Sequence, residues 1–504
     1  MSNSSIGATH EHDEDGAHLA SLGYKSDFKR DMSLWGNFAL GFTYLSPVVG
    51  VYSLFASSLG AGGPAMIWAV VIAAVGQLLV ATVFGEVVSQ FPVAGGIYPW
   101  ARRLWGARWA WMTGWVYMLA LIATIASVSY GAGAFFGMLF GFTAGTKTTV
   151  LCAIALILIV AVINMGGTRL MAKIAFFGFV AELVGAVAVG GWLLLTERHH
   201  NLSVLFHSEG AGSGGSYFSA FAAAALIGFY LYYGFEACGD VAEEVVDPGR
   251  QIPKAMRMTI YIGGVASFFI TLALVLAVPS FGDVIAGKDA DPVTTVLKDA
   301  FGTVGFRVVI AIVLISFFSC VVSLQAAASR LVYAYARDDM MPGSAIFKQF
   351  SAKRAVPPYA LALAAALPIV IILISLSSDN ALTRIVSFAS VGIYLGFMMV
   401  VLAALRARLK GWKPSGKFSL GQWGLVINVV ALVYQLAAAT DMAWPRGDKW
   451  YDRYLVLLSL AVILGVGLLY LFGARPHLRS DSAAGDAIPT SAPLTSPAIE
   501  GEIA

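Results

Sequence analysis

An acid inside an apolar stretch is the feature of this sequence that most clearly indicates chemistry. The stretch Ala222–Ala237 reads AAAALIGFYLYYGFEA, and its glutamate, Glu236, follows Gly228 and Gly234. A carboxyl group at bilayer depth is costly to insert, so it marks a functional site by default, and glycine weakens the helix before it. Broken helices around a midplane cavity form the binding sites of many secondary transporters. The alternative is a tightly packed helix whose glutamate pairs with a neighbour.

A second buried acid is predicted at Glu182, midway along IAFFGFVAELVGAV, with no basic residue within one helical turn. Two readings are open for this residue. It faces the interior of the helix bundle and binds a substrate amine or a proton, or it is neutral and hydrogen-bonded to a packed neighbour.

A second interruption is expected in WGNFALGFTYLSPVVGVYSLFASSLG, near the start of the chain. Pro47 removes a backbone donor from the helix, and Gly50 loosens the helix three residues later. Unpaired backbone at this depth is tolerated only where it faces a cavity. Interruptions at corresponding places in two halves are a sequence pointer to an inverted-repeat transporter.

The composition places these residues in a membrane. The chain has 504 residues, of which 58% are hydrophobic and only 12% charged, which excludes a soluble globular protein and predicts a polytopic membrane protein. The three cysteines lie in apolar runs without metal-like spacing, so we expect free thiols and no disulfide. Three histidines near the N-terminus stand among acids and are read as part of a solvated tail rather than a metal site.

We predict an all-α polytopic membrane protein with twelve transmembrane helices, since a span needs about 20 mostly apolar residues. The spans are expected at 35–59, 65–89, 109–139, 148–166, 171–195, 217–240, 256–279, 304–335, 359–377, 381–405, 422–440 and 452–473. Residues 31–405 would form a ten-helix transport core and residues 406–475 the last two helices. Residues 1–30 and 476–504 are expected to be disordered tails. The first thirty residues lack the pattern of a cleavable signal peptide, so the first span would direct insertion.

The Lys and Arg residues test this span count. With the N-terminus inside, 23 of the 32 Lys and Arg residues fall on the cytoplasmic side. Such a bias fits the positive-inside rule. It predicts a multi-pass protein of the cell membrane with both termini cytoplasmic.

Three motifs resemble those of one transporter family. Glu86–Gly106 (EVVSQFPVAGGIYPWARRLWG) resembles the signature after the second helix of amino acid–polyamine–organocation (APC) superfamily permeases. GFEACGDVAEEVVDPGRQIPKAM resembles the sixth helix and following loop, and Ala328–Pro342 resembles the end of the eighth. LWGNFALGF and Leu59–Trp68 resemble the branch that moves amino acids, choline-like amines, 4-aminobutyrate and polyamines.

The resemblance implies a LeuT-type 5+5 inverted repeat in which discontinuous helices 1 and 6 enclose the substrate. The family's first helix usually carries a Gly-x-Gly whose amides hold a substrate carboxylate. Here Val48 replaces the first glycine, and its side chain narrows the space in which the backbone amides would hold a carboxylate. The half-helix that starts near Gly50 still has a positive N-terminal end, which favours an anion. The residues implied in substrate binding are Ser46, Val48, Val49, Gly50, Tyr230, Tyr233 and Gly234.

The resemblance also assigns coupling and gating roles. Glu236 aligns with a family acid tied to proton-dependent gating, and Glu182 is the second candidate. Arg102 and Arg103 are expected at the cytoplasmic face, where they pair with Glu86 or with acids of the eighth span, and they would form a gate. The alternative is that they are plain positive-inside charges.

These observations favour a secondary active transporter of a small amino acid or amine that works by alternating access, either proton-coupled or by exchange. No cofactor, metal site, nucleic-acid partner, ATPase subunit or catalytic constellation is indicated, so we do not expect an enzyme. An amine, polyamine or choline-type transporter that does not recognise a carboxylate is one alternative. A nutrient sensor without transport and an ion channel are others. Substrate, direction, coupling ion and oligomeric state stay open.

Overall fold

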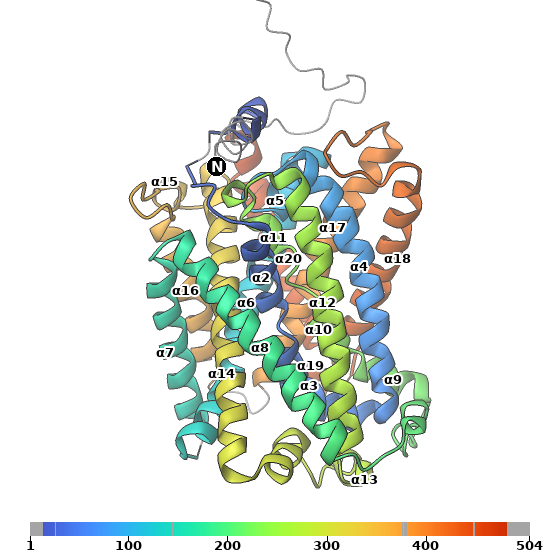
Figure 1. Ribbon diagram of the computed structural model, residues 1–504. Helices are drawn as coiled ribbons and strands as arrows, with labels where there is room; N and C mark the ends of the chain where they lie inside the picture. Colours follow the sequence, from blue (N-terminus) through green and yellow to red (C-terminus); the bar gives the residue numbers. More distant parts are fainter. Residues whose placement is uncertain are drawn as a thin grey trace, which may run out of the picture.

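The computed structural model describes residues 14–25, 27–143, 145–374, 376, 381–446 and 449–480. Within these ranges the chain is helical, and the only β pairings are the isolated bridges Met32–Val245 and Ser351–Val356. The long helices run roughly side by side in one bundle (Figure 1). The predicted all-α class is confirmed.

Ten helical segments among the described residues are long and apolar enough to cross a membrane. They are α2 (Leu34–Leu45) with α3 (Pro47–Gly62), α4 (Ile67–Gln90), α6 (Ala107–Phe140), α7 (Thr146–Asn164), α8 (Thr168–Thr196), α12 (Pro248–Ala277), α14 (Pro292–Arg337), α17 (Ala381–Leu409), α18 (Gly424–Ala443) and α20 (Leu455–Gly473). The two remaining predicted spans coincide with shorter apolar helices, Tyr217–Leu231 and α16 (Pro358–Ile374).

Short helices connect these segments. They are η1 (Pro64–Met66), α5 (Ile97–Trp105), η2 (Leu202–Phe206), α13 (Phe281–Ile285), α15 (Ser344–Phe347), η5 (Gly421–Trp423), α19 (Trp450–Arg453) and η6 (Pro476–Leu478). α5 lies at the end of the bundle where the N-terminus is (Figure 1).

Both predicted interruptions are present. α2 ends at Leu45, Ser46 has a left-handed backbone (φ 44°), and α3 begins at Pro47. In the second, α9 (Tyr217–Ala224) and α10 (Leu226–Leu231) give way to non-helical residues before α11 (Ala237–Asp240) and η3 (Ala242–Glu244). Gly234 lies in this gap at φ 118°, a conformation that only glycine adopts readily.

The two interruptions touch each other inside the bundle. A Cβ atom added to Gly234 would lie 2.6 Å from the amide nitrogen of Leu45, and one added to Gly50 would lie 2.5 Å from Cδ2 of Leu231. The glycines therefore permit the close approach of the broken helices. α2 packs against α8, α12 and α14, so the meeting point is enclosed.

The N-terminal segment differs from the predicted disordered tail. Residues 14–21 form a helix, and Leu19, Tyr24 and Phe28 are buried. The Tyr24 hydroxyl donates to Asp338 at 3.3 Å, beyond the end of α14. The apolar residues that recur in this polar segment form a face, and this face packs against the end of the bundle. At the other end Pro476–Leu478 is a short helix, while residues 1–13 and 481–504 of the predicted tails lie outside the described part of the chain.

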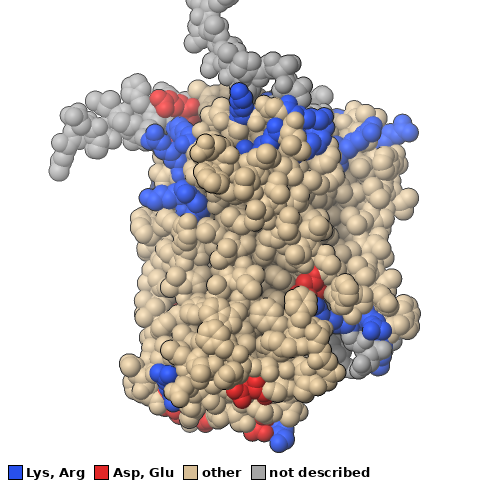
Figure 2. Space-filling model, turned by 90° about the vertical axis from the view of Figure 1, so that its right-hand side faces the viewer, with Lys and Arg blue, Asp and Glu red and all other residues tan. Residues whose placement is uncertain are grey.

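The surface supports a membrane location. Lys and Arg gather at the end of the molecule that carries the N-terminal segment, above a broad band with almost no charge (Figure 2). Large apolar side chains are exposed along the spans, such as Val162 (70%), Val265 (73%) and Leu469 (77%). The chain is therefore a multi-pass membrane protein.

Candidate functional site

Glu182 bridges α8 to the break in the first span. Its Oε1 accepts hydrogen bonds from Ser46 Oγ at 2.7 Å and from the Val48 amide at 2.9 Å. The side chain is completely buried. The carboxylate therefore caps the N-terminus of α3, where the helix dipole favours a negative charge. Glu182 therefore bonds to packed neighbours, and binding of a substrate amine or a proton stays a prediction.

The half-helix starts three residues earlier than predicted. The Gly50 amide donates to the Ser46 carbonyl at 3.1 Å, so it is part of the helix and is not an open donor. The Val49 amide donates to Ser46 Oγ at 3.3 Å. Proline at the first helical position explains the early start, because its missing N–H needs no partner there.

Glu236 closes the break in the sixth span. Its Oε2 accepts from the Gly234 amide at 2.7 Å, and its Oε1 accepts from the Tyr117 hydroxyl of α6 at 3.1 Å. The side chain has no exposed surface. The predicted acid thus lies at the break itself, bonded to backbone that the break leaves free.

Two buried residues next to Glu236, Asp240 and Tyr117, were given no role in the prediction from the sequence. Asp240 lies one turn after Glu236 and is fully buried, and its amide donates to the Glu236 carbonyl at 3.1 Å. Tyr117 comes from a different helix. The four-residue spacing of the two acids could have indicated Asp240, because residues four apart share a helix face. No local signal distinguishes Tyr117.

Three tyrosines form a chain of ring contacts beside the breaks. The rings of Tyr230 and Tyr233 are 5.5 Å apart and those of Tyr44 and Tyr233 are 6.2 Å apart, both edge-on. The Tyr230 hydroxyl lies 3.4 Å from Ser127 Oγ. All three tyrosines are buried, and their ring faces can attract a cation. Tyr44 was not predicted.

The predicted gate residues lie in two separate contacts. Arg102 pairs with Asp338 at 3.2 Å, an acid just after the eighth span, which was one of the two expected partners. Glu86 pairs with Arg408 instead, and the Arg103 guanidinium lies 5.7 Å from the centre of the Phe91 ring. Burial raises the pKa of the Asp338 carboxyl, and the guanidiniums of Arg102 and Arg337 oppose this rise.

Further ion pairs tie the loop after the sixth span to the end of α14. Arg330 bonds Glu244 at 2.8 Å, and Arg337 bonds Glu243 at 3.0 Å. The basic residues closest to these two glutamates in the sequence are Arg250, Lys254 and Arg257. The fold instead brings the eighth span over the loop, a contact that sequence proximity cannot predict.

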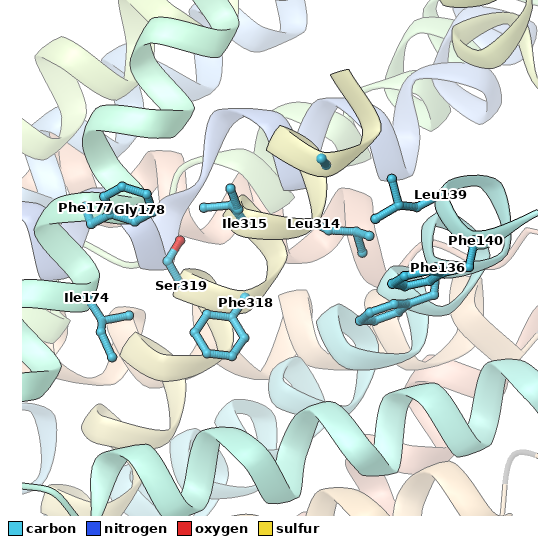
Figure 3. A pocket seen from close by; sticks show the side chains of 11 residues that line it. Phe136, Leu139, Phe140, Ile174, Phe177, Gly178, Leu314, Ile315, Phe318 and Ser319 are labelled. Atoms are coloured by element: carbon cyan, nitrogen blue, oxygen red, sulfur yellow. The ribbon is translucent and has the colours of Figure 1, made fainter. Parts of the chain in front are cut away.

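A groove between α6, α8 and α14 has a different character. Its side chains are apolar except for Ser319, and Phe136, Phe177 and Phe318 lie along it (Figure 3). Neither Glu182 nor Glu236 lines it. Its surface suits a hydrocarbon chain and not a charged solute.

The described residues contain no group of three or more His, Cys, Asp or Glu side chains placed to hold a metal ion. The three cysteines are free thiols, as predicted.

Comparison with known proteins decides the family. The amino acid permease family model matches residues 32–471. The chain belongs to this family. The amino acid permeases form part of the APC superfamily, so the resemblance drawn from the three motifs is confirmed.

Individual relatives agree with this membership. The amino-acid permease BAT1 of Arabidopsis thaliana is 26% identical, over 91% of this chain and 94% of its own length. A putative amino acid/polyamine transporter of Macrophomina phaseolina is 26% identical, over 77% and 88%. A GABA-specific permease of Saccharomyces cerevisiae is 24% identical, over 90% and 82%. These names are those of permeases and transporters, which supports an amino acid transporter and not an enzyme.

Proposed function

We propose that this amino acid permease is a secondary active transporter that moves a small amino acid or amine by alternating access, coupled to protons or to exchange. One observation carries the proposal. Two interrupted helices meet inside the bundle, and a buried acid bonds the free backbone of each interruption. Interrupted helices of this kind hold the substrate in many transporters. We further propose that the chain has twelve spans in a LeuT-type 5+5 inverted repeat.

The interruptions supply the moving parts of this mechanism. Glu236 holds the Gly234 amide and the Tyr117 hydroxyl, so it links the broken sixth span to α6. Protonation of Glu236 would turn one acceptor oxygen into a donor and rearrange that link. The same acid can therefore respond to a proton and to a ligand that touches the break.

The buried ion pairs would serve as the cytoplasmic gate. Arg102–Asp338, Arg330–Glu244 and Arg337–Glu243 hold α5, the end of α14 and η3 together. An inward-open state would have to separate at least some of them. The pairing of Glu86 with Arg408 of α17 supports a role for that glutamate in fixing α4 rather than in a contact with Arg102.

We propose that the permease lies in the cell membrane with both termini cytoplasmic. The Lys- and Arg-rich end carries the N-terminal segment (Figure 2), as the positive-inside rule requires. Ser480, the last described residue, bonds Arg102 at 2.7 Å, so the C-terminal part of the described chain reaches the same end.

Counterflow in proteoliposomes tests the proposal. Purified permease is reconstituted into vesicles loaded with unlabelled 4-aminobutyrate, putrescine or a mixture of amino acids, and entry of the labelled compound is measured. Entry above that of protein-free vesicles is expected for at least one compound, and an imposed pH gradient separates proton coupling from exchange. Ligand binding without counterflow would select a sensor, and an electrical current that does not saturate with ligand would select a channel.

A further inference from the structure

We propose that the substrate of this permease carries an ammonium group on a carbon without a carboxylate, as in an ω-amino acid or a simple amine, and that Glu182 binds this ammonium. The inference rests on the proposed transport function. It names the substrate class and gives Glu182 a specificity role.

The first argument is that the protein itself fills the anion site of the first span. The N-terminus of α3 offers the amides of Val48, Val49 and Gly50, since Pro47 has none. The Val48 amide donates to Glu182, and the other two donate to the side chain and the carbonyl of Ser46. A substrate carboxylate would find no free amide in this turn.

The second argument is that one carboxyl oxygen of Glu182 lacks a hydrogen-bond partner. Glu182 Oε2 is buried, and among the described residues it has no hydrogen-bond partner. No described Lys, Arg or His forms an ion pair with Glu182 either. A buried acceptor oxygen without a partner is costly, and the cost is greater when the group is charged. A cationic donor would remove that cost, and an anion would add to it.

The third argument is that aromatic rings lie near the same acid. The Cys320 thiol donates to the Tyr44 carbonyl at 3.3 Å, two residues before Ser46. The Tyr44 ring packs edge-on against Tyr233, and the Tyr233 ring in turn packs against Tyr230. The acid and the tyrosine rings therefore surround one region, and ring faces attract an ammonium ion.

An α-amino acid would have to displace Glu182 from the helix end. Its own carboxylate would then take the amide of Val48 while the glutamate stayed buried beside it. Two carboxylates in one buried site repel each other. This arrangement disfavours the substrate carboxylate at the break, whereas an ammonium at Oε2 leaves the cap in place.

Matched ligand pairs test the substrate class. Glutamate and 4-aminobutyrate differ only by the α-carboxylate, as do ornithine and putrescine. Binding to purified wild-type permease is measured by thermal shift and by competition. We expect the compound without the α-carboxylate to bind at least about tenfold more tightly in at least one pair. Equal or tighter binding of the α-amino acid in both pairs, or binding of none of the four compounds, would overturn the inference.

Two variants test the role of Glu182. In Glu182→Gln the amide oxygen can still accept from Ser46 and Val48, so the cap persists while the charge is lost. Affinity for the preferred amine should fall by about tenfold or more. In Glu182→Ala the Val48 amide at the N-terminus of α3 loses its acceptor and becomes free for a substrate carboxylate. The α-amino acid of each pair should therefore gain affinity relative to the amine. Glu197→Gln, the same change just after the C-terminal end of α8, is the control and should bind like wild type.

The outcomes separate this inference from the proposed function. Binding of the amine without counterflow would leave the substrate class intact and remove transport. Counterflow of α-amino acids with unchanged binding in Glu182→Gln would leave transport intact and remove the inference. The Gln variant decides the question even if the Ala variant does not fold.

Discussion

Glu236 accepts a hydrogen bond from the backbone amide of Gly234, two residues earlier, at 2.7 Å. The acid thus closes the interruption of its own helix, and the left-handed glycine makes that turn possible. A second acid, Glu182, does the same for the other interruption, but it comes from a neighbouring helix. The two breaks are therefore stabilised by carboxylates in different ways, one within its own span and one across spans.

The first prediction concerns the charge of Glu236. In Glu236→Gln the side-chain oxygen can still accept from Gly234, so the fold should persist, while proton exchange at this position is abolished. We expect uptake to be lost or to become independent of the pH gradient, with normal amounts of protein in the membrane. Uptake and its pH dependence are measured in proteoliposomes, with Glu197→Gln as control. Wild-type behaviour of the Glu236 variant would remove this acid from the mechanism.

The second prediction concerns the close approach at Gly234. Alanine at this position would adopt φ 118° and place its Cβ 2.6 Å from the Leu45 amide. Such backbone strain costs about 1–3 kcal/mol, and the clash with α2 adds to it. We expect Gly234→Ala to lower the melting temperature in detergent and to abolish uptake. Gly191→Ala in α8, where an added Cβ meets nothing within 4 Å, should melt like wild type; equal melting of both variants would contradict the packing described here.

The third prediction concerns Tyr230. Its buried ring contacts Tyr233, and its face can attract a substrate cation. Tyr230→Ala should raise the apparent KM by roughly 2- to 30-fold, the range of a cation–π contact, and Tyr230→Phe should raise it less. Initial uptake rates over a range of substrate concentrations provide the measurement. Tyr261→Ala, on an exposed tyrosine of α12 (54%), is the control, and identical kinetics of the Tyr230 and Tyr261 variants would rule out stacking.

The sequence was sufficient to predict the breaks and the acid at one of them. Pro47 and Gly234 stand in apolar runs, where proline and glycine weaken a helix, and Glu236 stands out because charge is rare there. The start of α3 was misplaced at Gly50 because glycine was weighted above the preference of proline for the first helical position.

The partners of these residues could not be predicted. Whether Glu182 faces the break depends on how α8 packs against α2, and Arg102 meets Asp338 across 236 residues of sequence. The packed N-terminal segment was missed for another reason. Its average composition is polar. The apolar residues Leu19, Tyr24 and Phe28 become buried only because the folded bundle offers a surface on which they pack.

The fourth prediction concerns the ion pair of Arg330 with Glu244. Both side chains are almost fully buried, so neutralising one leaves the other charge buried and unpaired. Arg330→Met should destabilise the permease by about 3–5 kcal/mol, and Arg330→Met with Glu244→Leu should cost less than the sum of the single changes. Thermal unfolding in detergent provides the measurement. Arg169→Met breaks the exposed pair with Asp31 and should change little, and additive effects at the buried pair would argue against coupling.

The fifth prediction concerns the pH dependence of stability at Asp338. Because burial raises the pKa of this carboxyl above its ordinary value, the folded state holds the proton at pH values where the unfolded state has lost it. Its contribution to stability is therefore fully present below the unfolded pKa and falls as the pH rises through the folded pKa.

Asp338→Asn removes this titration. We expect the melting temperature of wild type, relative to the variant, to increase as the pH is lowered from neutral, and to level off below the ordinary pKa of aspartate. Melting curves in one detergent between neutral pH and the lowest pH that keeps the protein in solution provide the comparison. The same change at exposed Asp31 is the control. A gap between wild type and Asp338→Asn that stays constant with pH, or shrinks as the pH falls, would show that burial does not govern this carboxyl.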